Sequence, residues 1–524
     1  MKREVEMRKA PFKNEPLTDF SVPANTKKMQ AAIDSVRGRL GKEYPSIVGN
    51  QKLFLKRKFS STNPSQKGQV VGVFQKADES HADMAVKVAA ETFGRWSLVE
   101  PAKRADYLFK AASIMRKRRL EFAAWMVFEV GKSWVEADAD VAEAIDFLEF
   151  YGREMLRYAG PQPLTKYPGE RGELKYIPLG VGTVIPPWNF PLAILVGMTS
   201  AAIVCGNTVV LKPSSDSPTI AAKFVEIMEG LKLPHGVLNF LPGSGGVVGN
   251  ALVGHRRTRF VAFTGSKEVG LGIVELAARH QPGQIWIKRV IAEMGGKDSI
   301  VVDSGCDVEA AASGVASSAF GFQGQKCSAC SRAIVVKSVY QKFIEELIPK
   351  VKAIKVGPVV SQENAMGPVI NQAAMDSIMK YIEIGKSEGQ LILGGSAMPG
   401  NGYFIEPTVI KDVHPRARIS QEEIFGPVLA IIKADDYDDA IAIANDTEYG
   451  LTGSVYTKSR RRIDKAKDFF HVGNLYINRK CTGALVGVNP FGGFNMSGTD
   501  SKAGGRDYLM LFTQAKAISE KVRK

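Results

Sequence analysis

Three side chains with complementary chemistry stand in segments whose residues allow close backbone approach. Cys327 follows a small Gly324-Gln325 approach, Glu293 opens the glycine-rich segment 293–297, and Asn189 stands in the proline-bounded turn 187–191. A thiol can attack a carbonyl carbon, a carboxylate can take a proton from water, and an amide can donate a hydrogen bond to an oxyanion. Together these groups predict acyl chemistry that passes through a thioester on Cys327.

The other cysteines allow fewer functions. Cys327 and Cys330 form a Cys-x-x-Cys pattern, which also occurs in redox dithiols and zinc sites. The sequence has no second such pattern and only six scattered histidines, so we predict no metal site. A regulatory disulfide is the open alternative, while Cys330 is interpreted as a packing residue behind the nucleophile. The remaining cysteines are interpreted as structural: Cys205, Cys306 and Cys481.

The composition is typical of a soluble protein with more than one folded unit. The chain has 524 residues, 45% hydrophobic and 23% charged, so we expect two or three domains. The most apolar stretch, 181–204, contains three prolines and an asparagine, which argues against a membrane span. The first six residues alternate in charge, so no secretory signal is expected. Five cysteines, an odd and sparse set, favour the reducing cytoplasm.

The formal net charge of +15 raises the question of nucleic-acid binding. Lysines and arginines are spread along the chain and alternate with acidic residues. The densest basic run, 459–467, is typical of a solvated helix face. We therefore expect no nucleic-acid partner, although a positive field can attract an anionic substrate and a dinucleotide.

Hydrophobic periodicity predicts the elements that must hold the reactive residues. Residues 81–129 and 134–157 have helical spacing, and residues 159–180 predict a protruding hairpin because prolines and glycines precede an extended segment. Beyond residue 180, short β-branched runs alternate with helical segments, which predicts a parallel sheet in an α/β domain. The strands predicted for this sheet are 182–185, 208–211, 237–241 and 260–264.

A second α/β unit is predicted after Glu293, with strands at 299–302 and 333–336. Its helix over 372–387 has apolar residues at the spacing of one helical face. We assign this stripe to the core: Met375, Ile378, Met379 and Ile382.

Two glycine-containing turns follow predicted strands and are candidates for phosphate binding. The segment 241–249 holds four glycines, and the segment 263–266 repeats the strand-to-helix arrangement. Glycines let the backbone approach a phosphate, and the N–H groups at a helix start attract it. The first segment departs from the usual dinucleotide fingerprint, so a simple tight turn is the alternative interpretation.

Five motifs occur in the order found in aldehyde dehydrogenases, and the chain resembles this family over about residues 40–520. They are Pro187–Pro191, Phe263–Ser266, Glu293–Lys297, Gly324–Cys327 and Glu423–Pro427. Segments 327–332, 482–487 and 490–494, with the tail 496–505, further resemble the 1-pyrroline-5-carboxylate dehydrogenase branch. That branch oxidises L-glutamate 5-semialdehyde to L-glutamate in proline degradation.

The resemblance implies the α/β aldehyde dehydrogenase fold in three parts. A Rossmann-like NAD-binding domain would span residues 1–158 and 181–292, and a catalytic α/β domain residues 293–490. A small β element for oligomerisation would combine residues 159–180 and 491–524. The implied assembly is a homodimer or a dimer-based homo-oligomer.

The resemblance also implies a cofactor, NAD, and its contacts. Lys212 would reach the adenosine ribose, with Ser215 beside it. Family members that prefer NAD often have a glutamate at the position of Ser215, so NADP is implied as a possible second cofactor. The remaining contacts would be Gly245, Gly249, Gly265 and Ser266 at the phosphates, and Glu423 and Phe425 at the nicotinamide ribose and ring.

For the reaction, the resemblance implies that Cys327 attacks the aldehyde, Asn189 holds the oxyanion and Glu293 activates water against the thioester. Partial burial should bring the pKa of Glu293 above its ordinary value of about 4.3. The semialdehyde also needs anchors for its carboxylate, its ammonium and its aliphatic chain. These would be Ser328, Gly483 and Ala484 for the carboxylate, Glu143 for the ammonium, and Phe190 and Phe494 for the chain.

Two other interpretations stay open on the sequence. The chain could be an aldehyde dehydrogenase for another carboxylated semialdehyde. It could also be a catalytically silent binding protein on the same scaffold, but such proteins usually lack the nucleophile, and Cys327, Glu293 and Asn189 are all present here.

Overall fold

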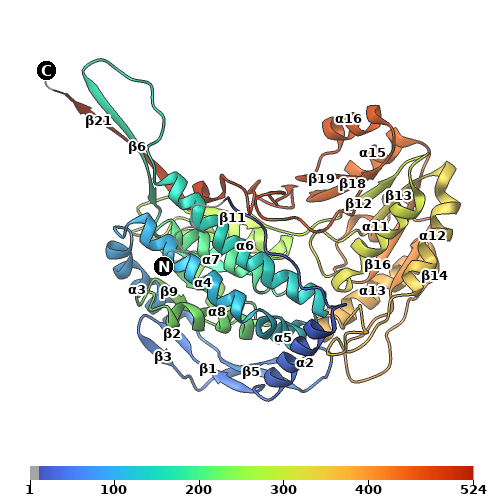
Figure 1. Cartoon of the computed structure of the whole chain (residues 1–524), viewed down its shortest axis with the longest axis horizontal. Coiled ribbons are helices and arrows are strands. Elements are labelled where there is room, and N and C mark those ends of the chain that lie inside the picture. Colours follow the sequence, from blue (N-terminus) through green and yellow to red (C-terminus); the bar gives the residue numbers. More distant parts are fainter. Residues whose placement is uncertain (1–10, 523–524) are drawn as a thin grey trace.

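A computed structural model describes residues 11–522 of the chain. The first ten residues, for which the sequence predicts no secretory signal, lie outside this range. Figure 1 shows a larger lobe, a smaller lobe beside it and a two-stranded arm that extends from the larger lobe. Among the described residues, no helix has both the length and the apolar character needed to cross a bilayer.

A seven-stranded sheet forms the centre of the larger lobe. Its strands are β2 (Ser46–Val48), β3 (Gln51–Leu53), β7 (Val181–Ile185), β8 (Thr208–Leu211), β9 (Leu238–Phe240), β10 (Thr258–Thr264) and β11 (Arg289–Glu293). Their order is β11-β10-β7-β8-β9-β2-β3, parallel from β11 to β9 and antiparallel at the β2–β3 edge. The four strands predicted here are therefore confirmed, with ends that agree within two residues.

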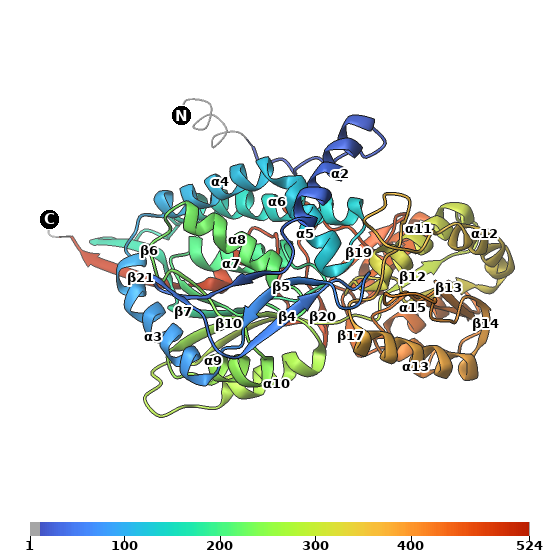
Figure 2. The ribbon, with the colours of Figure 1, turned by 90° about the horizontal axis from the view of Figure 1, so that it is seen from below.

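Helices lie on both faces of this sheet; most have one apolar side to bury, whereas Ala193–Val204 is buried on all sides. They are α3 (Glu79–Trp96), α4 (Pro101–Lys117), α5 (Arg119–Val130), α6 (Trp134–Tyr158), α7 (Ala193–Val204), α8 (Pro218–Gly230), η1 (Gly245–Gly249), α9 (Asn250–Gly254) and α10 (Lys267–Ala278). Figure 2 shows α4, α6, α7 and α8 above the strands, with α9 and α10 below them.

The helical region predicted over 81–129 is divided into three helices. Pro101 occupies the first turn of α4, where a missing N–H costs nothing, so a new helix starts there. Gly131 ends α5 in the left-handed region, with φ 66°, before α6 begins. The helix predicted over 134–157 is confirmed as α6.

The N-terminal part adds a helix and a small sheet for which the sequence offered no prediction. The helix is α2 (Pro23–Arg37), and the strands are β1 (Lys42–Tyr44), β4 (Lys58–Thr62) and β5 (Val70–Gln75) in the order β1-β5-β4. Strands β1 and β4 are short and show weak hydrophobic alternation, which is why periodicity missed them.

The smaller lobe repeats the α/β architecture. Its seven strands are β12 (Ser299–Val302), β13 (Arg332–Val336), β14 (Gln390–Leu393), β15 (Thr408–Lys411), β16 (Val428–Ala434), β18 (Thr452–Tyr456) and β19 (Asn474–Ile477). The order is β14-β15-β16-β13-β12-β18-β19, parallel except for β14. Its helices are α11 (Val308–Phe320), η2 (Gly321–Gly324), η3 (Lys337–Val339), α12 (Tyr340–Lys352), α13 (Gln372–Glu388), α14 (Arg418–Gln421), α15 (Tyr437–Asn445) and α16 (Arg460–Phe469).

Two predictions for this lobe are confirmed. The stripe on α13 faces the core, where Ile378 and Ile382 are buried and Met375 and Met379 pack against the same cluster. The basic run 459–467 lies on α16, whose first two arginines are exposed to solvent.

The arm has a different construction from the predicted one. Strand β6 (Glu170–Pro178) pairs antiparallel with β21 (Thr513–Lys521), so the partner of the extended segment comes from the C-terminal tail. The prediction of a hairpin within 159–180 was wrong in this respect. Prolines 161, 163 and 168 lack the N–H that a ladder requires, so the residues before β6 cannot supply the second strand.

The C-terminal segment before the arm returns to the first sheet. Its elements are β20 (Phe494–Asn495), which pairs with β17 (Tyr449–Gly450), and η4 (Tyr508–Phe512). Gly498 forms a bridge with Glu293, and Phe491 forms one with Ala503. Residues 491–505, which the resemblance groups with the arm, therefore contact the end of β11.

Candidate active site

The carboxyl ends of five parallel strands bring predicted site residues to one edge of the larger sheet. Asn189 follows β7, Lys212 follows β8, Gly245 follows β9, Gly265 follows β10, and Glu293 is the last residue of β11. Carboxyl ends of neighbouring parallel strands meet at the same edge, which is where ligands bind in open α/β sheets.

The nucleophile loop meets this edge through Asn189. Cys327 lies between η2 and β13 and is partly exposed. The Nδ2 atom of Asn189 donates to the carbonyl oxygen of Gln325, two residues before the thiol, over 3.1 Å. An amide nitrogen has two protons, so the second can still donate to an oxyanion. A Cβ at Gly324 would overlap the carbonyl oxygen of Gly426, so this turn requires glycine.

Glu293 is half-buried, and both of its carboxylate oxygens accept hydrogen bonds. Oε1 accepts from the hydroxyl of Ser501, and Oε2 accepts from the backbone N–H of Gly493 over 3.3 Å. Burial raises the pKa of Glu293 to about 8, although both donors act in the opposite direction. The expected upward shift is confirmed, and the group can exchange protons near neutral pH.

The thiol of Cys327 is held in its neutral form. Burial raises its pKa above the ordinary value, and the carboxylates of Asp298, Glu423 and Glu293 raise it further. Lys326, the neighbouring cation, instead pairs with Glu136 over 2.7 Å. The thiol must therefore lose its proton before it can attack.

The second cysteine of the Cys-x-x-Cys pattern packs in the core. Cys330 is 1% exposed and belongs to the hydrophobic cluster between α11 and the second sheet. All five cysteines are free, and no cluster of three potential metal ligands occurs within residues 11–522.

Lys212, the predicted contact for the adenosine ribose of the cofactor, is buried. The Nζ atom of Lys212 donates to the carbonyl of Pro213 over 2.9 Å, and burial lowers its pKa to about 8. Gly249 lies against it, since a Cβ there would be 3.6 Å from Lys212 Cε. Ser215 is exposed, and its neighbour Asp216 interacts electrostatically with Lys212. Sequence reasoning missed Asp216 because the comparison with NAD-preferring family members considered the preceding residue, Ser215.

The two glycine turns differ in what they offer a phosphate. Gly245 is exposed at the start of η1, and a Cβ there would meet no atom within 4 Å. The N–H of Gly265 is already used, because it donates to the carbonyl of Glu293 over 3.1 Å. Ser266 caps α10 by accepting from the N–H of Val269 over 3.4 Å, so its hydroxyl proton stays available.

Glu423 and Phe425 lie near the predicted catalytic residues. Oε1 of Glu423 accepts from the N–H of Gly296 over 3.0 Å, and burial raises its pKa to about 7. Phe425 has φ 57°, and its ring meets the ring of Trp188 edge-on at 5.5 Å. Trp188 precedes Asn189, so Phe425 lies close to the turn that holds the predicted amide donor.

An ion pair that the sequence did not indicate stands beside the predicted ammonium contact. Glu143 is half-buried on α6, and burial raises its pKa to about 8, with Asp140 adding to the shift. Asp140, three residues earlier on the same helix, pairs with Lys132 over 2.6 Å, and both side chains are fully buried. Lys132 Nζ also lies 4.1 Å from the ring centre of Phe190.

The proposed carboxylate contacts come from two segments that meet. Ser328 is 7% exposed, and its carbonyl accepts from the thiol of Cys481 over 3.4 Å. The loop that follows Cys481 contains Gly483, which has φ 82° and is exposed, and the partly buried Ala484.

Phe494 and Phe190 contact different residues. The ring of Phe494 is 5.1 Å from the ring of His471 and 5.2 Å from Lys502 Nζ. Within the described residues the two phenylalanine rings do not touch, so a channel lined by both stays a prediction.

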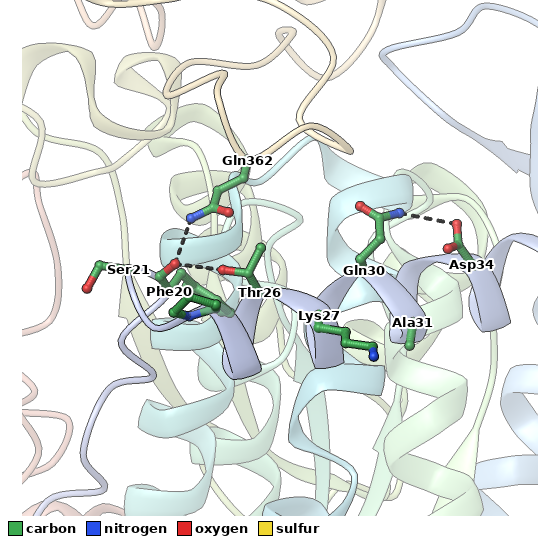
Figure 3. A pocket seen from close by; sticks show the side chains of 9 residues that line it. Phe20, Ser21, Thr26, Lys27, Gln30, Ala31, Asp34 and Gln362 are labelled. Atoms are coloured by element: carbon green, nitrogen blue, oxygen red, sulfur yellow. Dashed lines mark hydrogen bonds between the residues drawn. The ribbon is translucent and has the colours of Figure 1, made fainter.

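A surface groove lies away from all of these residues. It runs beside α2 and is lined by side chains that include Phe20, Thr26, Gln30 and Gln362 (Figure 3). Gln362 Nε2 donates to the carbonyl of Phe20 over 2.8 Å. The groove lining holds no thiol or predicted site residue, so we place the active site at the sheet edge.

The chain is similar over nearly its whole length to proteins of one family. The aldehyde dehydrogenase family sequence profile matches residues 53–518. A protein of Geobacillus thermodenitrificans called 1-pyrroline-5-carboxylate dehydrogenase is 57% identical over 510 residues, which cover 97% of this chain and 99% of that protein.

Two solved structures show the same fold. The 1-pyrroline-5-carboxylate dehydrogenase from Thermus with bound NAD has a TM-score of 0.96 and 49% identity, and the match covers 98% of this chain and 99% of the other. Proline utilization A from Bdellovibrio bacteriovorus has the same TM-score at 44% identity, and the match covers 98% of this chain but 53% of the other. This protein belongs to the aldehyde dehydrogenase family.

Proposed function

We propose that the protein oxidises L-glutamate 5-semialdehyde, formed from 1-pyrroline-5-carboxylate, to L-glutamate with NAD in proline degradation. The hydrogen bond between Cys481 and Ser328 carries this proposal, because it joins the nucleophile segment to the loop of Gly483 and Ala484. The high identity to relatives called 1-pyrroline-5-carboxylate dehydrogenase supports the same substrate.

The first step forms a covalent bond at Cys327. The thiol of Cys327 loses its proton to water, and the sulfur attacks the aldehyde carbon. The aldehyde oxygen becomes the oxyanion of a thiohemiacetal. The free proton of the Asn189 amide and the N–H of Cys327 donate to this oxyanion.

The second half releases the acid. NAD, when bound, supplies the acceptor for the hydride that leaves the thiohemiacetal carbon. A thioester to Cys327 remains, and Glu293 takes a proton from water as the water attacks it. Collapse of the tetrahedral adduct returns the sulfur to Cys327 and frees L-glutamate.

The residues at the sheet edge fit a dinucleotide. Lys212, buried and bonded to a single carbonyl, has protons left for ribose hydroxyls.

The open backbone at Gly245, with Gly249 behind it, suits the phosphates, and Ser266 still has its hydroxyl proton to donate. Gly265 would act by its lack of a side chain, because its N–H is bonded to Glu293. Glu423 and Phe425 would hold the nicotinamide ribose and ring.

We infer that NAD is preferred over NADP. Ser215 itself does not repel a 2′-phosphate, but the carboxyl of Asp216 beside Lys212 brings an acidic group to the same place. Burial raises the pKa of Asp216, which moderates the repulsion, so some use of NADP is expected. The NAD-bound relative from Thermus supports the same preference.

The amino-acid end of the substrate would be bound through both its carboxylate and its ammonium group. Ser328 and the N–H groups near Gly483 and Ala484 would bind the carboxylate, and Glu143 would face the ammonium. An ammonium near Glu143 favours its ionised form, which offsets the effect of burial on its pKa. Phe190, held against Lys132, and Phe494 would contact the aliphatic chain.

We also propose a homodimer or a dimer-based homo-oligomer in the cytoplasm. The β6–β21 arm extends from the body, and Leu164 and Tyr167 before it are 47% and 70% exposed. Exposed apolar side chains also gather on and after α10: Val269, Leu271, Val274, Ile285 and Ile287. Such surface is usually covered by a partner. Removal of residues 513–524 should lower the molar mass measured by light scattering.

Steady-state kinetics test the proposed reaction. Pyrroline-5-carboxylate, succinate semialdehyde and propanal are compared with NAD and with NADP. We expect the highest kcat/KM for pyrroline-5-carboxylate with NAD. Equal rates with succinate semialdehyde would assign the chain to another carboxylated semialdehyde, and no reduction of either cofactor would assign it to the silent scaffold.

A further inference from the structure

The carboxylate of Glu293 lies in a cradle formed by the C-terminal segment 492–501. The hydroxyl of Ser501 and the N–H of Gly493 bind its two oxygens. A Cβ at Gly492 would be 2.8 Å from Oε1, and a Cβ at Gly498 would be 3.1 Å from Oε2. The cradle therefore fits the carboxylate closely and leaves no room for side chains at these glycines.

Lys502 fixes the shape of this cradle. Its Nζ atom donates to the carbonyl oxygens of Gly473 and Gly492, and it lies over the ring of Phe494. The lysine thus connects the tail to the smaller lobe at the turn that holds the carboxylate. Ser501 is 3% exposed, so water does not compete freely for its hydroxyl.

We propose that Ser501 is a positioning residue for the proposed base, and that its hydroxyl holds the Glu293 carboxylate in the cradle where it takes a proton from water. The proposal rests on the proposed function, because it gives Ser501 a role only if Glu293 hydrolyses a thioester. A carboxylate held by directed donors keeps its orientation toward water, which a freely rotating side chain would lose.

The hydrogen bond between the Ser501 hydroxyl and the Glu293 carboxylate also affects the pKa of Glu293. The charged or titratable groups that face Glu293 are Lys502 and Asp500 from the tail, the thiol of Cys327, and the Tyr508 hydroxyl from η4. The Ser501 hydroxyl donates to the ionised carboxylate, and this donation lowers the pKa of Glu293. Removing the donor must raise that pKa, so a larger fraction of the base is protonated at neutral pH.

The test compares Ser501→Ala with Ser501→Thr, which keeps a hydroxyl, across a pH series. In Ser501→Ala we expect the acid limb of kcat to move to higher pH by about one unit, so that turnover at pH 7 falls roughly five- to tenfold. KM for pyrroline-5-carboxylate and the pre-steady-state burst of NADH should stay unchanged at pH 9, and Ser501→Thr should restore the profile.

Thr499→Val is the matched control. Thr499 lies in the same turn, but its hydroxyl bonds the backbone of Ala292 and not the carboxylate. We expect a lower unfolding temperature without a shift of the acid limb. In a Glu293→Gln background, Ser501→Ala should lower hydrolysis no further, because both changes act through one carboxylate.

An unshifted acid limb in Ser501→Ala, or an additive loss in the double variant, would overturn the role of Ser501. These outcomes differ from failure of the proposed function, in which the parent protein itself would not oxidise the semialdehyde. If Ser501→Ala fails to fold, Ser501→Cys, with its weaker donor, supplies the same comparison and should show a smaller shift in the same direction.

Discussion

The side-chain amide of Asn189 donates to the main-chain carbonyl of Gln325 over 3.1 Å and so joins the two lobes at the reactive thiol. Asn189 follows the first sheet, whereas Gln325 precedes Cys327 in the second lobe. Ile370 N donates to the side chain of Gln325 over 2.9 Å, which fixes the acceptor from its other side. The same contact therefore positions the proposed oxyanion donor and the proposed nucleophile.

Replacing Asn189 by alanine should remove one oxyanion donor. We expect kcat to fall about 100- to 1,000-fold, equivalent to ~3–4 kcal/mol, with a smaller change in KM. Asn207→Ala is the control, because Asn207 is an equally buried amide that bonds backbone at Ala202 and Phe512. The control should lose stability in urea unfolding but keep its turnover once folded.

Replacing Glu293 by glutamine should separate the two half-reactions. Because hydrolysis of the thioester loses its base, we expect a burst of NADH followed by slow turnover, measured by stopped flow. In the parent protein the pKa of Glu293 is raised to about 8, so turnover should rise with pH through that value as the carboxylate becomes the ionised base. A Glu293→Gln protein with full steady-state turnover would remove this residue from the mechanism.

Alkylation of the resting protein should report the neutral thiol of Cys327. Burial and three nearby carboxylates raise its pKa, so little thiolate exists at neutral pH. We expect iodoacetamide to inactivate the cofactor-free protein more slowly at pH 7.5 than it alkylates a small cysteine peptide, and the rate to increase up to at least pH 9. Equal rates for protein and peptide would contradict a raised pKa. Peptide mass mapping identifies the modified cysteine.

Replacing Ser328 by alanine should weaken binding of the substrate carboxylate. We expect KM for pyrroline-5-carboxylate to rise about tenfold while kcat changes little, because the hydroxyl contacts the substrate before and during the reaction alike. KM for propanal, which has no carboxylate, should not change. Ser313→Ala on the exposed face of α11 is the control, and an unchanged KM in Ser328→Ala would exclude the serine from the site.

The buried pair of Lys132 and Asp140 should matter for stability. Lys132→Met leaves the Asp140 carboxylate buried without its cation, and we expect a loss of ~3–5 kcal/mol in the free energy of unfolding. Lys337→Met removes a cation from a pair with Asp435 in which both side chains are mostly exposed, so it should cost below ~1 kcal/mol. Urea titration of both variants measures the difference.

Much of the fold followed from local patterns in the chain. Short β-branched runs between amphipathic helices predicted the parallel strands β7, β8, β10, β12 and β13, because strand and helix periods are properties of neighbouring residues. Asn189 and Lys212 follow two of these predicted strands, which places them at one sheet edge. The strand that ends at Glu293, β11, was not predicted. The trio of Cys327, Glu293 and Asn189 was recognisable because each residue stands in a short motif that neighbouring residues define.

Contacts between distant segments could not be predicted in this way. Strand β6 pairs with β21, which lies more than 300 residues further along the chain. The residues of β6 alone do not indicate which strand pairs with them. The donors to Glu293 come from Gly493 and Ser501, about 200 residues further along the chain. Asp216 and Asp298 also gained their roles only through burial beside charged neighbours.

The amino-acid sequence by itself determined the chemical groups and several of the strands near them, since these depend on residue type and local spacing. The tertiary structure decided the protonation of those groups. Burial and the arrangement of neighbouring charges raise the pKa of both Cys327 and Glu293, and such effects depend on atoms brought together from both lobes and from the C-terminal tail.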